Sequence, residues 1–164
     1  VVARADLSEL ATDAGRKEVL HRLAVQGILT EAEEKAFPMS WLQQFGASAL
    51  CRRMRSSSSL LREESFLCGF TPQELHSLVP HFQVPEEADE DELIIVQGVI
   101  DAAFLEDGQW ILVDYKTDRY FSAETLAMYQ TQLAIYGQAL GRITRRPVKE
   151  KILYQVRSGK EYKM

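Results

Sequence analysis

The sequence predicts an α/β fold in which helices flank a mixed β-sheet. Three observations carry this prediction: a β-hairpin at residues 97–116, a long amphipathic helix after it, and an apolar strand after that helix. The dipeptide at residues 107–108, Asp-Gly, favours a two-residue turn because both residues of such a turn take positive φ. A helix between two strands allows a right-handed parallel crossover, so we expect three antiparallel strands, a helix and a further strand.

The length and composition fit one globular domain. The chain has 164 residues, of which 46% are hydrophobic and 26% charged, enough to build a core. We divide it into a helical N-terminal part, residues 1–55, and a core at residues 60–164 that carries the predicted sheet. No apolar run is long enough to span a bilayer, and the N-terminus has no signal-peptide pattern. The two cysteines, Cys51 and Cys68, fit a reducing, cytoplasmic setting without a disulfide framework or zinc site.

Helix signals dominate the N-terminal part. Residues 6–9 (Asp-Leu-Ser-Glu) have the form of a capping box, and Gly27 is expected to end the helix that follows. Residues 30–33 form a second capping box, which opens a helix that Pro38 ends. The apolar residues between 41 and 50 predict one more short helix.

The first strand of the core is predicted at residues 60–70, after a short serine loop at residues 56–59. Thr71 and Pro72 then mark the start of a helix, because threonine caps a helix and proline suits its first position. The acidic run at residues 86–92 is expected to be a solvated loop that leads into the hairpin.

The hairpin carries the charged residues on which the functional prediction rests. A two-residue turn at residues 107–108 brings Asp101 opposite Asp114, with side chains about 5 Å apart on one face. Lys116 lies two residues beyond Asp114 and therefore shares that face. Strict alternation puts Val99 on this face too and Ile100 on the opposite one. Both faces are largely apolar, so we expect the sheet to be covered on both sides.

Two interpretations of this charge group remain open at the level of geometry. Facing carboxylates in a partly dry site repel each other, and one takes up a proton unless a cation lies between them. A divalent metal would suit these hard oxygen ligands. The structural alternative is a hairpin in which Lys116 neutralises one aspartate.

A long helix is predicted from Ser122 to about residue 140, where Gly141 is expected to end it. Its apolar residues recur at three- and four-residue spacings, as on a face packed against a core. Gln132 and Tyr136, four residues apart, lie on one side of this helix at the edge of the apolar stripe. Residues 151–156 form the last predicted strand.

The charge of the chain is unevenly distributed. The formal net charge is −5, yet residues 142–164 hold eight lysines and arginines against two glutamates, a local net charge of +6. Such a basic flank suits either a path for phosphates or a solubilising surface.

Four motifs in order resemble the nuclease domain of the RecB family, within the PD-(D/E)xK restriction-endonuclease-like superfamily. G-x-x-D matches residues 98–101, D-x-K matches residues 114–116, Q-x-x-x-Y matches residues 132–136 and R-E-x-x-F matches residues 62–66. Each motif is weak alone, but each lies on the expected element, and the resemblance covers the chain from residue 30 onward. It implies a restriction-endonuclease-like sheet and a metal-dependent DNA nuclease.

Within that family, residues 97–104, 113–119 and 132–140 are most similar to the AddA branch of helicase–nucleases. The resemblance implies an ATP-dependent helicase motor that feeds single-stranded DNA to the nuclease, an AddB-like partner chain, and processing of DNA double-strand breaks for recombinational repair. The chain starts at Val1 without a methionine, and we expect it to be a piece of a larger protein. It contains no P-loop, so any helicase motor would lie outside it. An iron–sulfur cluster is not expected, because no cysteine follows Cys68.

The resemblance also implies roles for single residues. Those expected at the catalytic site are Glu63, Asp101, Asp114, Lys116, Gln132 and Tyr136. Asp101 and Asp114, with the backbone carbonyl of Tyr115, would hold Mg²⁺ or Mn²⁺, and Lys116 would orient the attacking water or stabilise negative charge. The expected DNA contacts are Thr117, Arg119, Gln132 and Tyr136.

One part of the family pattern has no counterpart here. The family carries an upstream metal-binding histidine in a G-T-x-x-H helix, and His21 does not fit that pattern. The resemblance therefore implies an incomplete metal shell and weak cutting by this chain alone. Two other functions remain as alternatives: a catalytically silent module that docks helicase or partner subunits, and a stand-alone RecB-like exonuclease. The intact aspartates and lysine favour a nuclease, and since none of these groups reads bases, one with little sequence specificity.

Overall fold

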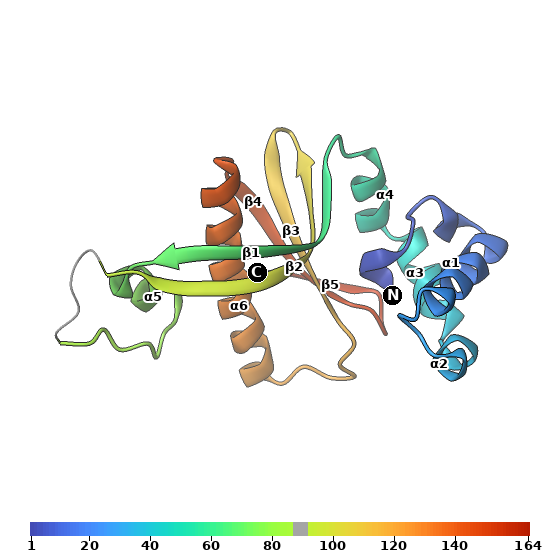
Figure 1. Ribbon diagram of the computed structural model, residues 1–164, viewed down its shortest axis with the longest axis horizontal. Helices are drawn as coiled ribbons and strands as arrows, with labels where there is room; N and C mark the ends of the chain where they lie inside the picture. The colour runs from blue at the N-terminus through green and yellow to red at the C-terminus, as the bar shows by residue number, and fades with distance from the viewer. Residues whose placement is uncertain (87–91) are drawn as a thin grey trace.

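A computed structural model describes residues 1–86 and 92–164 and has a five-stranded mixed sheet at its centre (Figure 1). The strands lie in the order β1 (Leu60–Phe70), β2 (Ile94–Glu106), β3 (Gln109–Lys116), β4 (Val148–Gln155) and β5 (Lys160–Lys163). β3 and β4 are parallel, and the other neighbouring strands are antiparallel. This arrangement confirms the predicted fold class, including the helical crossover into β4.

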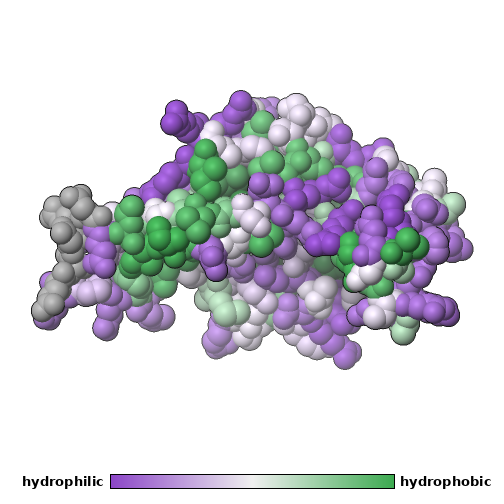
Figure 2. Space-filling model, viewed as in Figure 1, coloured by the Kyte–Doolittle hydropathy of each residue, from purple (hydrophilic) through white to green (hydrophobic). Residues whose placement is uncertain are grey.

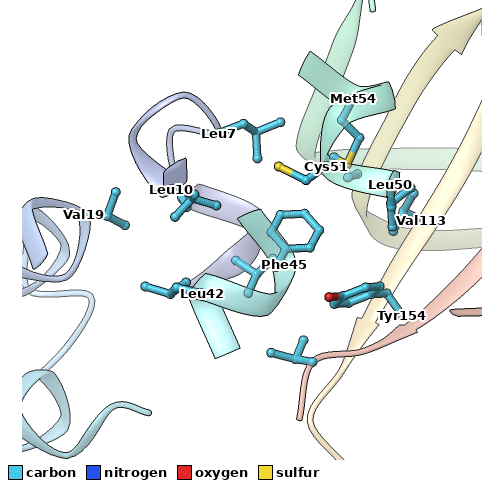
Figure 3. Packing of buried hydrophobic residues seen from close by; sticks show 14 of the residues in the cluster. Leu7, Leu10, Val19, Leu42, Phe45, Leu50, Cys51, Met54, Val113 and Tyr154 are labelled. Carbon is cyan, nitrogen blue, oxygen red and sulfur yellow. The ribbon is translucent and has the colours of Figure 1, made fainter. Parts of the chain in front are cut away.

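Helices cover both faces of the sheet. The crossover helix α6 (Ala123–Thr144) packs on one face, around Leu112, Leu133 and Leu153. The helical N-terminal part covers the other face, where Phe45 packs between its own helices and Tyr154 of β4 (Figure 3). Its elements are the 3₁₀ turns Val2–Arg4 and Glu9–Ala11 and the helices α1 (Asp13–Val25), α2 (Glu31–Ala36), α3 (Met39–Ala47) and α4 (Ala49–Ser56). The short helix α5 (Pro72–Leu78) follows β1. In the described ranges, no helix has the length and apolar character needed to cross a bilayer.

Several boundaries in the N-terminal part differ from the sequence prediction. Asp6 accepts hydrogen bonds from the amide and hydroxyl of Ser8, and so closes a local turn instead of opening the first helix. That helix begins at Asp13, where the Thr12 hydroxyl caps it. The helix predicted around residues 41–50 is divided at Ser48, whose hydroxyl caps the second piece. Asx and Ser/Thr hydrogen bonds thus favour local turns over the longer helices predicted.

Differences also occur near the C-terminus. α6 continues through Gly141 to Thr144 and ends at Arg145, which takes a left-handed conformation with φ of 54°. Pro147 cannot continue the helix, and β4 starts directly after it, three residues earlier than predicted. Strand β5 has a polar sequence and was not predicted, because only its pairing with β4 makes it a strand. The acidic run predicted as a loop lies largely in residues 87–91, outside the described residues.

The hairpin between β2 and β3 has the predicted register. Glu106 pairs with Gln109 and Ala102 with Val113, and both turn residues have positive φ. The ladder ends at the pair Ala102–Val113, one position before Asp101 and Asp114. We call this point, where β2 and β3 part, the fork.

Side-chain alternation reverses beside the fork, which strict alternation did not predict. Ile100 and Ala103 both pack on the α6 side, whereas Ala102 packs against the helical N-terminal part. β1 reverses opposite Asp101, at Glu63, which has a left-handed φ of 49°. Such a paired irregularity bends strands and redirects side chains next to functional sites. The prediction that Ile100 lies on the face opposite Asp114 was therefore wrong.

Beyond the fork, β1 and β2 continue as a two-stranded arm that reaches past β3 (Figure 1). Because alternation has reversed, odd-numbered positions of this arm face solvent. Leu67, Ile95 and Val99 are 64%, 55% and 48% exposed, and Figure 2 shows apolar side chains gathered along the arm. Val99 was predicted on the face of Asp114, and its exposure follows from the same reversal.

Gly98 is where α6 docks against the arm. A Cβ added at this position would lie 2.5 Å from the Tyr136 hydroxyl oxygen and 2.9 Å from a ring carbon of Phe66. The rings of Phe66 and Tyr136 pack edge to face with centroids 4.8 Å apart. The glycine of G-x-x-D and the tyrosine of Q-x-x-x-Y are therefore in direct contact, and this contact fixes α6 across β2.

We predict that Gly98→Ala destabilises the protein by about 1–3 kcal/mol, because the added methyl group overpacks this contact. The free energy of unfolding from urea titration measures the effect. Gly141→Ala is the matched control: within α6, its added methyl would meet the Arg146 carbonyl oxygen at 3.4 Å, and alanine is the better helix former, so no loss is expected. Equal stability of the Gly98→Ala variant and the wild type would contradict the contact.

An ion-pair network joins α4 to the sheet at the far end of the hairpin. Arg53 bridges Glu106 at 2.9 Å and Glu150 at 2.5 Å, and Lys149 contacts Glu106 at 3.0 Å. Arg53 and Lys149 lower the pKa of Glu106 from its usual 4.5 to about 2. The ionised form of Glu106 therefore stabilises the fold above pH 4.5, and that contribution is lost as the pH falls toward 2.

We predict that Glu106→Gln flattens the fall in unfolding free energy between pH 4.5 and about 2, since it removes one group whose folded-state pKa is depressed. Urea titrations across this pH range measure the slope. Glu64→Gln, at an exposed position of β1, should leave the slope unchanged. A slope that is the same for Glu106→Gln and the wild type would rule out the contribution.

Candidate active site

At the fork, the carboxylate of Asp101 takes the place of a strand partner. Its Oδ2 accepts a hydrogen bond of 2.8 Å from the backbone amide of Tyr115. Because β2 and β3 no longer pair here, this amide has no ladder acceptor on β2, and Asp101 supplies one. The hydrogen bond ties the end of β2 to the D-x-K segment of β3.

Asp101 borders a pocket of about 310 Å³ between the sheet and the helical N-terminal part. Polar groups of the strands line one side, and apolar and aromatic residues line the other. The lining residues are Val1, Val2, Ala3, Phe37, Trp41, Glu63, Asp101, Tyr115, Thr117 and Val156. The pocket is thus large enough for a small group and has a carboxylate at its wall.

Asp114 lies on the α6 side of the fork and is 6% exposed. Asp101 borders the pocket on the other side and the two residues do not pair in the ladder, so the prediction that their carboxylates face each other on one face was wrong. Nζ of Lys116 is 2.9 Å from Oδ2 of Asp114 as an ionic neighbour, and among the residues that the structure describes none donates a hydrogen bond to this oxygen. Lys116 donates to Oε1 of Gln132 at 3.2 Å, and its Nζ lies 4.4 Å from the ring centre of Tyr129. Two residues of α6 therefore hold the lysine against the aspartate.

Burial raises the pKa of both aspartates. The Tyr115 amide and Lys116 oppose this effect at Asp101, and its pKa remains above the usual value. At Asp114, Lys116 lowers the pKa and the charge of Asp101 raises it, with burial still dominant. The ionised pair is therefore under-compensated, and an added cation would stabilise both charges.

The donor set at the fork suits a small, hard cation. In the part of the chain that the structure describes, no three His, Cys, Asp or Glu side chains come together as a ligand cluster. The available protein ligands are two carboxylates and the carbonyl of Tyr115. Mg²⁺ is commonly held by one or two carboxylates with water and substrate phosphates completing its shell, so these residues fit such an ion.

The other predicted site residues lie in different settings. Glu63 lines the pocket of Asp101 and forms an ion pair with Arg4. Thr117 lines the same pocket, Tyr136 packs on Gly98 at the arm, and Arg119 is exposed with its guanidinium 5.4 Å from the ring centre of Tyr120. The structure thus brings Asp114, Lys116 and Gln132 into contact and joins Asp101 to them through the Tyr115 amide. Tyr136 and Arg119 lie outside this group of residues.

One residue that the sequence analysis missed organises the segment after D-x-K. Gln155, at the end of β4, is buried, and its Nε2 donates to the carbonyl of Asp118 at 2.8 Å. Its Oε1 accepts from the Ser158 hydroxyl at 2.7 Å. A glutamine within the apolar stretch KILYQV is the signal that could have found it, because a buried amide must be hydrogen-bonded.

Comparisons with known proteins identify relatives of this chain. It is similar to the AddA chain of the ATP-dependent helicase/nuclease of Clostridium kluyveri, with 33% identity over 155 residues, and to that of a Thermoanaerobacter species (strain X514), with 33% identity over 162 residues. The protein of the same name from Alkaliphilus oremlandii is 31% identical over 157 residues. These alignments cover 94–97% of this chain but only 12–13% of each relative, so the chain spans about an eighth of their length.

The match at the level of the superfamily covers almost the whole chain. A sequence model described as the PD-(D/E)XK nuclease superfamily matches residues 3–163. The mixed sheet and the positions of the G-x-x-D and D-x-K motifs at the fork agree with this match. The chain therefore belongs to the PD-(D/E)XK nuclease superfamily, and it matches the nuclease region of the AddA helicase/nuclease proteins.

Proposed function

We propose that this chain is the metal-dependent DNA nuclease domain of an ATP-dependent helicase–nuclease of the AddA type. The observation that carries the proposal is the fork, where the buried Asp114 contacts Lys116 and the partly buried Asp101 is tied to the same segment through the Tyr115 amide. Burial raises the pKa of both aspartates. A purely structural module has no need for two carboxylates in a site that disfavours their ionisation. We treat residues 1–164 as one nuclease domain, cytoplasmic and without membrane contact.

The wider role follows from the relatives and is part of the proposal. Those proteins are named as parts of an ATP-dependent helicase/nuclease, and this chain spans 12–13% of their length. We infer that a helicase motor outside this region feeds single DNA strands to the site for exonuclease cleavage. Assembly with an AddB-like partner and the processing of DNA double-strand breaks for recombination complete this assignment, in preference to a stand-alone exonuclease.

Each residue at the fork has a proposed task in phosphodiester hydrolysis. Asp101, Asp114 and the Tyr115 carbonyl would hold Mg²⁺ or Mn²⁺. When bound, the metal lowers the pKa of a coordinated water and offsets the charge of the phosphate. Lys116 orients the attacking water or stabilises the negative charge that develops on the phosphate oxygens.

Residues around the fork would keep this arrangement in place. Gln132 holds Lys116 through its side-chain oxygen, so the lysine does not depend on Asp114 alone for its position. Glu63 would shape the metal shell through a water, and Thr117, Arg119 and Gln132 would contact the DNA backbone. Tyr136, against Gly98, would act by positioning α6. None of these groups reads base edges, so cleavage should be largely independent of sequence.

We predict that Asp114→Asn lowers the cleavage rate of single-stranded DNA in Mg²⁺ by more than ~100-fold, because it removes a charged ligand without changing shape. Release of labelled nucleotides measures the rate. Asp107→Asn is the matched control, since Asp107 is an exposed aspartate at the tip of the same hairpin and should not affect cleavage. Cleavage by Asp114→Asn at the wild-type rate would refute the site. Wild-type protein that folds and binds DNA but never cuts it would favour the silent docking module.

We also predict that Mg²⁺ stabilises the folded protein. Binding to the native state alone adds about 2.7 kcal/mol of unfolding free energy when free Mg²⁺ is roughly 100-fold above its Kd. Thermal or urea unfolding with and without Mg²⁺ measures this gain, which should be lost in Asp114→Asn and kept in Asp107→Asn. A gain of the same size in all three proteins would place the metal elsewhere.

A further inference from the structure

Arg157 lies beside the pocket that Asp101 borders and is not one of the residues that the proposed hydrolysis uses. Its Nε donates a hydrogen bond of 2.6 Å to the backbone carbonyl of Thr117. The carbon of its guanidinium group lies 4.8 Å from the ring centre of Trp41. Thr117 and Trp41 both line the pocket, so the guanidinium group is fixed at its rim by one hydrogen bond and one aromatic face.

The backbone around Arg157 is fixed as well. It belongs to the turn between β4 and β5, which closes with Gly159 at a φ of 67°. The amide of Val156 donates to the carbonyl of Lys116 at 2.9 Å, which joins this turn to the D-x-K segment. In Figure 1 the turn lies next to the helical N-terminal part, where α3 supplies Trp41. The position of Arg157 is therefore set both by the segment around D-x-K and by the helical N-terminal part.

The charge of Arg157 is available for a ligand. Within residues 1–86 and 92–164, no carboxylate lies within 4.0 Å of its guanidinium group, and its terminal nitrogens donate no hydrogen bond to the protein. Two other cations near the fork already contact acids, since Lys116 contacts Asp114 and Arg4 contacts Glu63. Asp101 and Glu63 make the pocket wall acidic, so a phosphate that approaches the fork needs a cation at this rim.

We propose that Arg157 is a phosphate-binding residue for the DNA strand that is cut at the fork. A planar guanidinium group with free terminal nitrogens binds two phosphate oxygens at once and stacks on an aromatic ring, which a lysine cannot do. Trp41 and Thr117 hold the plane of the group, and the terminal nitrogens take a phosphate next to the scissile one. This inference rests on the proposed nuclease function and adds a substrate contact to it.

The test measures binding separately from cleavage. A fluorescein-labelled oligothymidylate of roughly 16 nucleotides is titrated with the whole chain in EDTA, where no metal supports cutting. Arg157→Gln should weaken binding roughly ten- to hundredfold, as expected for a lost charge-assisted hydrogen bond. The slope of log K against log salt should become shallower by about 0.7, the value for one phosphate of a single strand. Arg157→Lys should keep the slope but bind more weakly than the wild type.

The matched control is Arg146→Gln. Arg146 is another exposed arginine of the basic C-terminal flank, but it borders a different pocket, beside α6, and its loss changes the net charge equally. We expect it to keep wild-type affinity. If both variants weaken binding by the same factor, the effect is general electrostatics and the proposal is wrong. Absence of measurable DNA binding by the wild type would overturn it as well.

A double-mutant cycle with Trp41→Ala tests how Arg157 is held. If Trp41 acts by fixing the guanidinium plane, Trp41→Ala weakens binding, and adding it to Arg157→Gln causes little further loss. Full additivity would remove Trp41 from the proposal. If circular dichroism shows that Trp41→Ala fails to fold, Trp41→Phe, which keeps a ring, should bind DNA as the wild type does.

Failure of the phosphate-binding proposal can be told apart from failure of the nuclease proposal. Binding that depends on Arg157 without cleavage in Mg²⁺ would overturn the nuclease function alone.

Discussion

The site depends on one hydrogen bond, from the backbone amide of Tyr115 to the carboxylate of Asp101. It forms where β2 and β3 stop pairing, and so it replaces the next rung of the ladder with a charged side chain. A strand amide without an acceptor would be costly in this buried setting. The parting of the strands and the placement of Asp101 are therefore one feature. The reversal of alternation at Glu63 and Asp101 then turns the arm of β1 and β2 away from the core.

The charged groups at the fork also destabilise the folded protein. Burial raises the pKa of both Asp101 and Asp114, so their ionised forms are disfavoured in the folded protein, and Lys116 offsets only part of this cost. Elsewhere acids are well compensated, as at Glu106, whose pKa falls to about 2 beside Arg53 and Lys149. This contrast between a compensated and an under-compensated acidic group is typical of a functional site set on a stable scaffold.

Three separate parts of the chain meet at the site. α6 contributes Gln132, which holds Lys116, and Tyr136, which fixes the helix on Gly98. The turn after β4 joins D-x-K through the Val156 amide, and Gln155 binds the loop that follows. The helical N-terminal part closes the pocket from the other face of the sheet. The short motifs are far apart in the sequence, but in the folded chain each supplies one contact of the same site.

The sequence alone was enough to predict the two strands of the hairpin, their register, and the helical crossover between β3 and β4. Asp107-Gly108 fixes a two-residue turn, and a two-residue turn leaves only one register for Ala102 and Val113. It did not determine the reversal beside Asp101, the strand β5 or the approach of Arg157 to Trp41. These depend on partners distant in the chain: alternation is local, whereas a bend, an edge strand and a stacked guanidinium exist only once other elements have packed against them.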